Sequence, residues 1–201
     1  MLERNSDQFQ PANSFNQDRD LYARLNQYMD TVELSLKQGR GWFIFNADRT
    51  RAARISTLLL ERLAGYRPFV SYFHVPWRDF SLNAYMKEVE LSDEERNQAQ
   101  AANDQHLKKE LNIARRVTTD TSWAMLVSDL VIISGLAPKH DHEARRLAQV
   151  MEGRFNRQMA TVLITPQMPH ELAEDFDQLA PETDFWGNLY GRMYKTGFMA
   201  L

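Results

Sequence analysis

The stretch GWFIFNADRTRAARISTLLLERLAG, residues 41–65, decides the fold. It opens with a continuously apolar run at 42–45, which is typical of a strand that is covered on both faces. Four aliphatic side chains then recur at helical spacing: Ile55, Leu58, Leu59 and Leu63. A strand, a turn and a helix form the junction at which many α/β proteins bind phosphates, yet this turn contains neither glycine nor lysine.

The length and composition are those of a single soluble globular domain. It has 201 residues, 43% hydrophobic and 25% charged, with a net charge of −3. The absence of cysteine excludes disulfides and thiolate sites and fits a reducing cytosol. We find no signal peptide and no apolar run that could span a bilayer, so we expect a cytoplasmic protein without a membrane partner. We assign residues 1–18 to a flexible polar tail and 19–201 to a single domain.

Further segments extend the strand–helix pattern on both sides of the opening stretch. An amphipathic helix precedes it and ends near Gly39, and a polar helix is predicted over 91–117. Three more apolar strands are predicted at 67–75, 128–136 and 160–166, and another amphipathic helix separates the last two. This alternation predicts a mainly parallel sheet flanked by helices.

The order of these parts resembles the AAA+ ATPases of the DnaC/IstB helicase-loader group, with the DnaA/Hda group as second choice. The similarity runs from about residue 20 to residue 198. YARLNQYMDTVELSLKQGRG is similar to the helix that leads into the family's P-loop strand, and WGNLYGRM to the segment of its arginine finger. The segment 128–172 resembles its Walker B strand, the following helix and its sensor-1 strand. The resemblance implies a P-loop NTPase (AAA+)-like core, and we expect that core without a lid subdomain.

The resemblance also shows where the phosphate-binding loop departs from the family. In a P-loop, G-x-x-x-x-G-K-[ST] supplies backbone N–H groups, a lysine charge and a magnesium ligand. Here the loop reads NADRTRAA, residues 46–53, so Ala52 and Ala53 stand at the lysine and the Ser/Thr. Arg49 and Arg51 replace loop glycines, and their Cβ atoms would hold the backbone away from phosphates.

At the remaining functional positions of the family, this sequence also lacks the expected residues, with one exception. Ser134 and Gly135 stand where the family has the two Walker B acids. Arg192 alone keeps the expected residue type, at the arginine-finger position. We therefore expect a non-enzymatic protein with no nucleotide cofactor and no metal.

Two sets of arginines suggest phosphate or nucleic-acid contacts. Arg49, Arg51 and Arg54 begin the helix after the first strand, with Asp48 placed as its N-cap, and a helix start attracts anions. Arg145 and Arg146 lie on a later predicted helix whose basic face would suit a phosphate backbone. The alternative for both sets is a solvated surface whose charges pair with nearby acids.

Three other features have competing interpretations. HDHE, residues 140–143, is either half of a metal site or a helix start capped by Asp141. His74 and Asp79 would form an acid–base pair only if the fold brings a nucleophile to them. The aromatic segment 184–201 either presents a patch to a protein partner or closes the sheet edge.

Three functional hypotheses follow. The first is a non-catalytic AAA+-like adaptor or regulator in DNA replication, transposition or mobile-element biology. It would act through protein–protein contacts with an active ATPase, a helicase or a second copy. The second is a nucleic-acid-binding module that uses arginine-rich surfaces without nucleotide, and the third is an unrecognised α/β enzyme.

Overall fold

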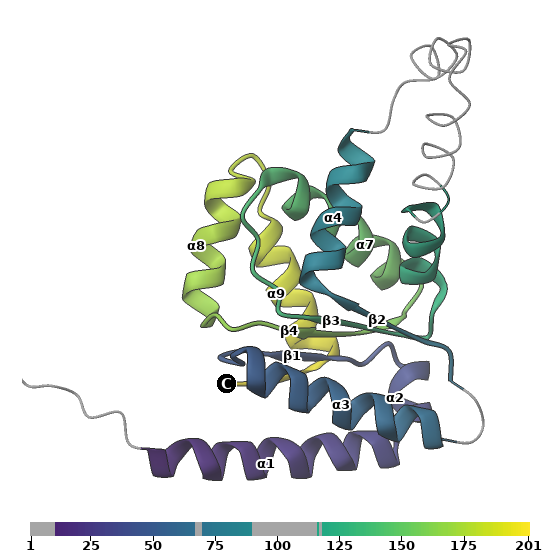
Figure 1. Ribbon diagram of the computed structural model, residues 1–201, viewed down its shortest axis with the longest axis vertical. Coiled ribbons are helices and arrows are strands. Elements are labelled where there is room, and N and C mark those ends of the chain that lie inside the picture. Colours follow the sequence, from purple (N-terminus) through teal and green to yellow (C-terminus); the bar gives the residue numbers. More distant parts are fainter. Residues whose placement is uncertain (1–10, 67–69, 90–115, 117) are drawn as a thin grey trace, which may run out of the picture.

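A five-stranded parallel sheet forms the centre of the molecule, a computed structural model (Figure 1) that describes residues 11–66, 70–89, 116 and 118–201. The strand order is β2-β3-β4-β1-β5, and every pairing between neighbours is parallel. The strands are β1 (Trp42–Ile44), β2 (Tyr72–Pro76), β3 (Leu130–Ser134), β4 (Ala160–Ile164) and β5 (Phe198–Ala200). The parallel sheet predicted from the alternating pattern is confirmed.

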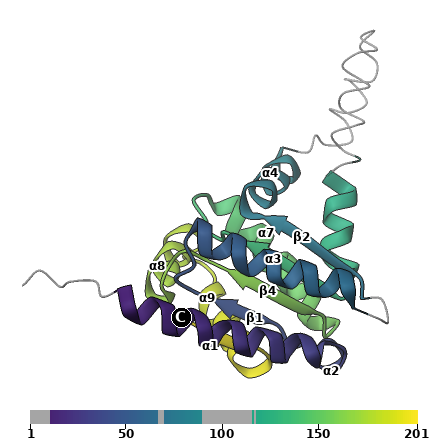
Figure 2. The same cartoon turned by 60° about the horizontal axis from the view of Figure 1, so that its bottom comes forward.

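Helices cover both faces of this sheet. They are α1 (Pro11–Asp30), α2 (Val32–Lys37), α3 (Arg49–Gly65), α4 (Trp77–Glu88), α7 (Asp141–Asn156), α8 (Pro169–Leu179) and α9 (Phe185–Thr196). A further helical stretch over 118–127 precedes β3. Figures 1 and 2 show α1 and α3 on one face and α4, α7, α8 and α9 on the other. None of the helices in the described residues is both long and apolar enough to cross a membrane.

The alternation of β1 divides the core into two layers. Trp42 and Ile44 pack with the α1 and α3 side, whereas Phe43 and Phe45 pack with the α7, α8 and α9 side. All four side chains are at most 1% exposed, so both faces of the strand are buried. This is the reason the strand reads as an unbroken apolar run.

The N-terminal boundary differs from the one predicted. Helix α1 begins at Pro11, so residues 11–18 belong to it and not to a tail. The predicted single helix also divides at Thr31, which separates α1 from α2. Residues 1–10 and nearly all of the predicted polar helix at 91–117 lie outside the described residues.

A buried arginine joins the 118–127 helix to the sheet. Arg154, on α7, is 0% exposed and donates to the hydroxyl of Thr161 on β4 at 2.9 Å. It also donates to the carbonyl oxygens of Met125 at 2.7 Å and Ser128 at 3.0 Å, and to that of Ala160. Burial lowers the pKa of Arg154 to about 10, against the opposing charge of Asp129. One guanidinium thus satisfies carbonyls from two chain segments.

Candidate functional site

The connection from β1 to α3 is the candidate site because it lies where the fold class binds nucleotide. Residues 45–48 form the whole connection between the two elements. Ala52 is buried in the first turn of α3 and Ala53 is exposed, so two methyl groups stand at the positions matched to lysine and Ser/Thr. Asn46 adopts a left-handed backbone with φ of 51°, which turns the chain sharply out of the strand.

Three backbone donors of this connection, those of Phe45, Asn46 and Ala47, point to neighbouring chain segments. The N–H of Phe45 donates to the Ala200 carbonyl at 2.9 Å. The N–H groups of Asn46 and Ala47 donate to the carbonyls of Gln167 at 3.1 Å and Thr165 at 2.8 Å. These three amides are therefore engaged within the sheet and its loops.

A carboxylate occupies the start of α3. Asp48 is the N-cap residue, as predicted, and its Oδ1 accepts a hydrogen bond from the backbone N–H of Arg51 at 2.7 Å. The first turn of a helix carries a partial positive charge that attracts anions. At this junction the anion is a side chain of the protein.

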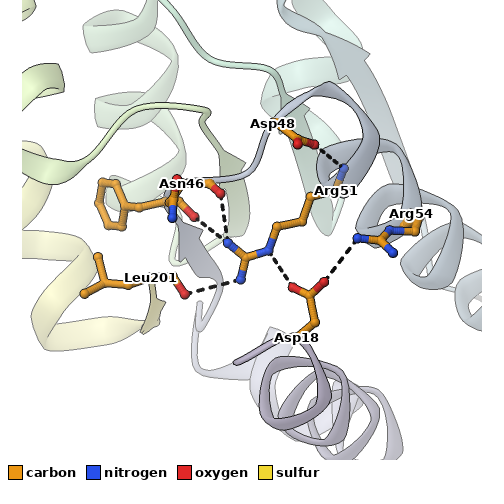
Figure 3. Close-up of polar contacts among 7 residues, drawn as sticks. Asp18, Asn46, Asp48, Arg51, Arg54 and Leu201 are labelled. Carbon is orange, nitrogen blue, oxygen red and sulfur yellow. Dashed lines mark hydrogen bonds and ion pairs between the residues drawn. The ribbon is translucent and has the colours of Figure 1, made fainter. Parts of the chain in front are cut away.

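Arg51 is 9% exposed, and its guanidinium contacts the backbone of the same connection (Figure 3). Its Nε donates to Asp18 at 2.8 Å, and its Nη1 donates to the carbonyl of Asn46 at 2.9 Å. Nη1 also lies 3.3 Å from the Phe45 carbonyl, and Nη2 donates to the Leu201 carbonyl at 3.2 Å. Arg51 thus ties α1, the β1–α3 connection and the end of β5 together.

The other two arginines of this set lie further out. Arg54 donates from Nη2 to the second carboxylate oxygen of Asp18 at 3.1 Å, and Arg49 is exposed at the first position of α3. Arg51 and Arg54, predicted as phosphate contacts, therefore share one internal carboxylate. Sequence reasoning missed Asp18 by placing it in the tail, although it precedes Leu21 and Leu25 at the same helical spacing.

The end of β3 holds a serine–histidine contact in place of acids. Ser134 ends the strand, and Gly135 follows with φ of 75°. The Oγ of Ser134 lies 2.9 Å from Nε2 of His74 on β2, so the fold does bring a hydroxyl to this histidine. Burial lowers the pKa of His74, while the nearby carboxylate of Asp79 acts in the opposite direction.

The start of α7 is capped differently from the prediction. The N-cap is His140, and Glu143 closes the turn by accepting from the backbone N–H groups of Lys139 at 2.6 Å and His140 at 3.0 Å. Asp141 is already inside the helix, where it accepts from Arg145 at 2.8 Å. The expected cap at Asp141 is thus corrected, because the longer Glu143 side chain reaches back to both free amides. The part of the chain that the structure describes holds no group of three or more His, Cys, Asp or Glu side chains suited to a metal.

Arg145 and Arg146 are engaged or partly buried on α7. Arg145 pairs with Asp141 and, at 2.9 Å, with Glu88 of α4. Arg146 donates from Nη1 to Gln149 at 3.3 Å, while its Nε and Nη2 are buried without a partner. Burial lowers the pKa of Arg146. Neither side chain presents a free guanidinium to solvent.

The C-terminal aromatic segment closes the sheet next to β1 and also leaves aromatic surface exposed. Phe185, Leu189 and Met193 of α9 are buried in the core, and β5 extends the sheet next to β1. On the outer side of α9, Tyr194 is 71% exposed. Arg192 is exposed as well, and its guanidinium carbon lies 5.3 Å from the centroid of the Phe155 ring.

Comparison with solved structures identifies the class of fold. The chain is similar to AMPPCP-bound DnaA from Aquifex aeolicus, with a TM-score of 0.53 and 12% identity over 92% of this chain. A crystal structure of a DNA replication initiation factor aligns with a TM-score of 0.49 and 13% identity over the same share. The chain spans about half the length of these proteins, 46% of each. No protein family profile and no curated protein matches the chain.

The strand order, the parallel pairing and the DnaA neighbour together define an AAA+-like P-loop fold. In the sequence resemblance, the β1–α3 connection corresponds to the family's P-loop, and the end of β3 corresponds to the end of its Walker B strand. The fold was predicted from the order of elements, and this prediction is confirmed.

Proposed function

We propose that this chain is a non-catalytic AAA+-like protein, an adaptor or regulator in DNA replication, transposition or mobile-element biology. It acts through protein–protein contacts and does not hydrolyse ATP. The observation that carries the proposal is the closed β1–α3 connection, where the protein's own groups take the roles that nucleotide phosphates would take.

The residues of this connection do not fit a nucleotide. A P-loop binds phosphates with free backbone N–H groups and the positive end of its helix. Here the amides of Phe45, Asn46 and Ala47 donate to carbonyls, and the Asp48 carboxylate caps the helix. A phosphate would have to displace hydrogen bonds and approach a negative side chain.

The residues around the metal position do not fit a magnesium ion. Magnesium is held by carboxylates, phosphates and water in near-octahedral geometry. Ser134 offers a hydroxyl that is engaged with His74, and Gly135 offers no side chain. Ala53, at the Ser/Thr position, offers a methyl group. These identities support a fold kept for its surfaces.

The test is calorimetric titration of the full chain with ATP and ADP, each with and without magnesium. We expect no binding heat and no shift of the thermal unfolding midpoint with either nucleotide. The control is Asp48→Ser, which removes the capping charge but keeps a capping oxygen. Micromolar, magnesium-dependent binding to the wild-type chain would overturn the proposal.

The proposed partner is a catalytically active ATPase or a helicase, and Arg192 is the residue suited to reach its nucleotide. An arginine supplied in trans stabilises transition-state charge in nucleotide hydrolysis. Arg192 is exposed, has no carboxylate partner among the described residues and is supported by the Phe155 ring. We expect the wild-type chain to raise the ATP turnover of such a partner. Arg192→Lys should lose most of this effect, whereas Arg19→Lys should retain it.

A further inference from the structure

The amino-terminal edge of the sheet is the end at which its parallel strands begin. The chain segments that lead into β1, β4 and β5 meet there and bring positive charges together. Gly39 has φ of 65°, and a Cβ there would lie 2.8 Å from the Gln158 carbonyl oxygen. A Cβ on Gly41 would lie 1.8 Å from the Thr161 carbonyl oxygen, and the Gly41 carbonyl accepts from the N–H of Phe198 at 2.9 Å. The loops before β1, β4 and β5 are thus in backbone contact.

The chain just before each of these strands carries exposed cations and no acid, and before β5 it is the last part of α9 and Gly197. The segments 38–41, 157–159 and 192–197 read QGRG, RQM and RMYKTG. Their charged residues, all exposed, are Arg40, Arg157, Arg192 and Lys195. We call this group the amino-edge cations.

The amino-edge cations are not neutralised by the fold. None of them joins an ion pair with a described carboxylate, and Arg157 donates only to the Leu126 carbonyl, at 3.2 Å. Glu33 pairs with Lys37, and the carboxylate of Asp129 accepts from Ser71. Unpaired guanidinium and ammonium groups on one edge form a surface for a polyanion.

An aromatic side chain borders the same edge. Tyr194 lies between Arg192 and Lys195 in sequence and is 71% exposed. Its ring stacks on that of Tyr190, with centroids 6.4 Å apart and planes at 15°, and Tyr190 contacts Trp186 in turn. The outer face of Tyr194 is therefore held in place and open to a planar ligand.

We propose that this edge binds single-stranded nucleic acid, with the amino-edge cations on phosphates and Tyr194 stacked on a base. Single strands are held by a combination of positive groove and aromatic platform. A duplex hides its base faces and would leave Tyr194 without a role, and an acidic peptide offers no planar group to it. The proposal is independent of the absence of nucleotide binding, because it uses the opposite edge of the sheet.

The test is fluorescence anisotropy of a labelled oligothymidylate of about 20 nucleotides, over about 50 to 200 mM KCl. We expect the triple variant Arg40→Ala, Arg157→Ala, Lys195→Ala to weaken binding at least tenfold. It should also reduce the slope of log K against log salt by about 2, because single strands contribute about 0.7 per phosphate contact. Tyr194→Ala should weaken binding about tenfold with an unchanged slope, and Tyr194→Phe should restore it.

The matched control removes the same charge from the opposite edge. The variant Arg19→Ala, Arg78→Ala, Lys139→Ala changes exposed cations in α1, at the start of α4 and just before α7, and should leave affinity and slope unchanged. Circular dichroism checks that each variant is folded, and Tyr194→Ala alone serves as the test if the triple variant is not. An effect of the control variant equal to that of the triple variant overturns the proposal. The proposal is also overturned if duplex DNA or polyglutamate binds with the same affinity as oligothymidylate, or if Tyr194→Ala leaves the affinity unchanged.

Discussion

The two edges of the one sheet use their arginines in opposite ways. At the carboxyl-terminal edge, Arg51 and Arg54 share the carboxylate of Asp18 (Figure 3), and Arg145 bridges two acids of its own. At the amino-terminal edge, Arg40 and Arg157 have no carboxylate partner among the described residues. Cation density along the sequence is therefore a poor guide to available charge. What matters is whether the fold supplies a partner.

Arg154 shows that burial, and not position, decides whether an arginine at the amino-terminal edge is engaged by the fold or available to a ligand. It is separated from Arg157 by less than one helical turn, yet it is fully buried, and its partners are carbonyls and a hydroxyl. Arg157 makes one carbonyl contact and is exposed. The pair provides the sharpest comparison of structural and free arginine in the molecule.

The largest effect is expected for Arg154→Met. The variant leaves several buried carbonyls and the Thr161 hydroxyl without a donor, and each such group costs about 1–3 kcal/mol. We expect the free energy of unfolding to fall by about 3 kcal/mol or more. Urea denaturation followed by circular dichroism measures it. Arg157→Met is the control and should stay within about 0.5 kcal/mol; equal losses in the two variants would break the comparison.

A smaller loss is expected for Arg51→Ala. It removes the ion pair with Asp18 and three carbonyl contacts at a nearly buried site, so we expect about 2 kcal/mol. Asp18→Ala should cost less, and the double variant should cost less than the sum, because both act on one interaction. Arg54→Ala, exposed on the same carboxylate, should cost under about 1 kcal/mol. Additive losses in the denaturation curves would show that Arg51 and Asp18 are not coupled.

The sequence predicted the fold where local pattern and tertiary environment agree. The apolar runs that became β1, β3 and β4 are buried on both faces, so their composition alone marks them as central strands. The stripe of α3 and the cap at Asp48 were also found, since both are set by residues within one or two turns.

Other elements depend on distant partners and were missed. β5 has three residues, and only its pairing with β1 makes it a strand. The predicted alternation has no helix after β4, yet Leu172 and Phe176 bury one face of α8 there. The end of the chain likewise folds as α9 because Leu189 and Met193 reach the core.

The site could be located from sequence, but its internal contacts could not. The missing glycines and lysine are visible in the printed residues. The pairing of Arg51 with Asp18 joins positions 33 residues apart, and its contact with the Leu201 carbonyl joins positions 150 apart. No local spacing predicts such contacts. From the sequence alone, the arginines after β1 are therefore compatible both with phosphate ligands and with partners of acids in the same chain.

The smallest effect concerns His74, the titratable group in contact with Ser134 at the carboxyl-terminal edge. Burial lowers its pKa in the folded protein, while the unfolded chain keeps a value of about 6.5. Below that pH the unfolded chain binds the proton more readily, so stability should fall as the pH drops through and below about 6.5. Above it, this contribution is fully present and constant.

His74→Gln, which keeps a polar group near Ser134, should flatten the dependence of stability on pH between about 5 and 7. The difference in slope cannot exceed one proton, about 1.4 kcal/mol per pH unit. Urea titrations across this range measure it, with His170→Gln, an exposed histidine on α8, as the control. Parallel curves for His74→Gln and the wild-type chain would mean that His74 titrates in the folded protein as it does in the unfolded chain.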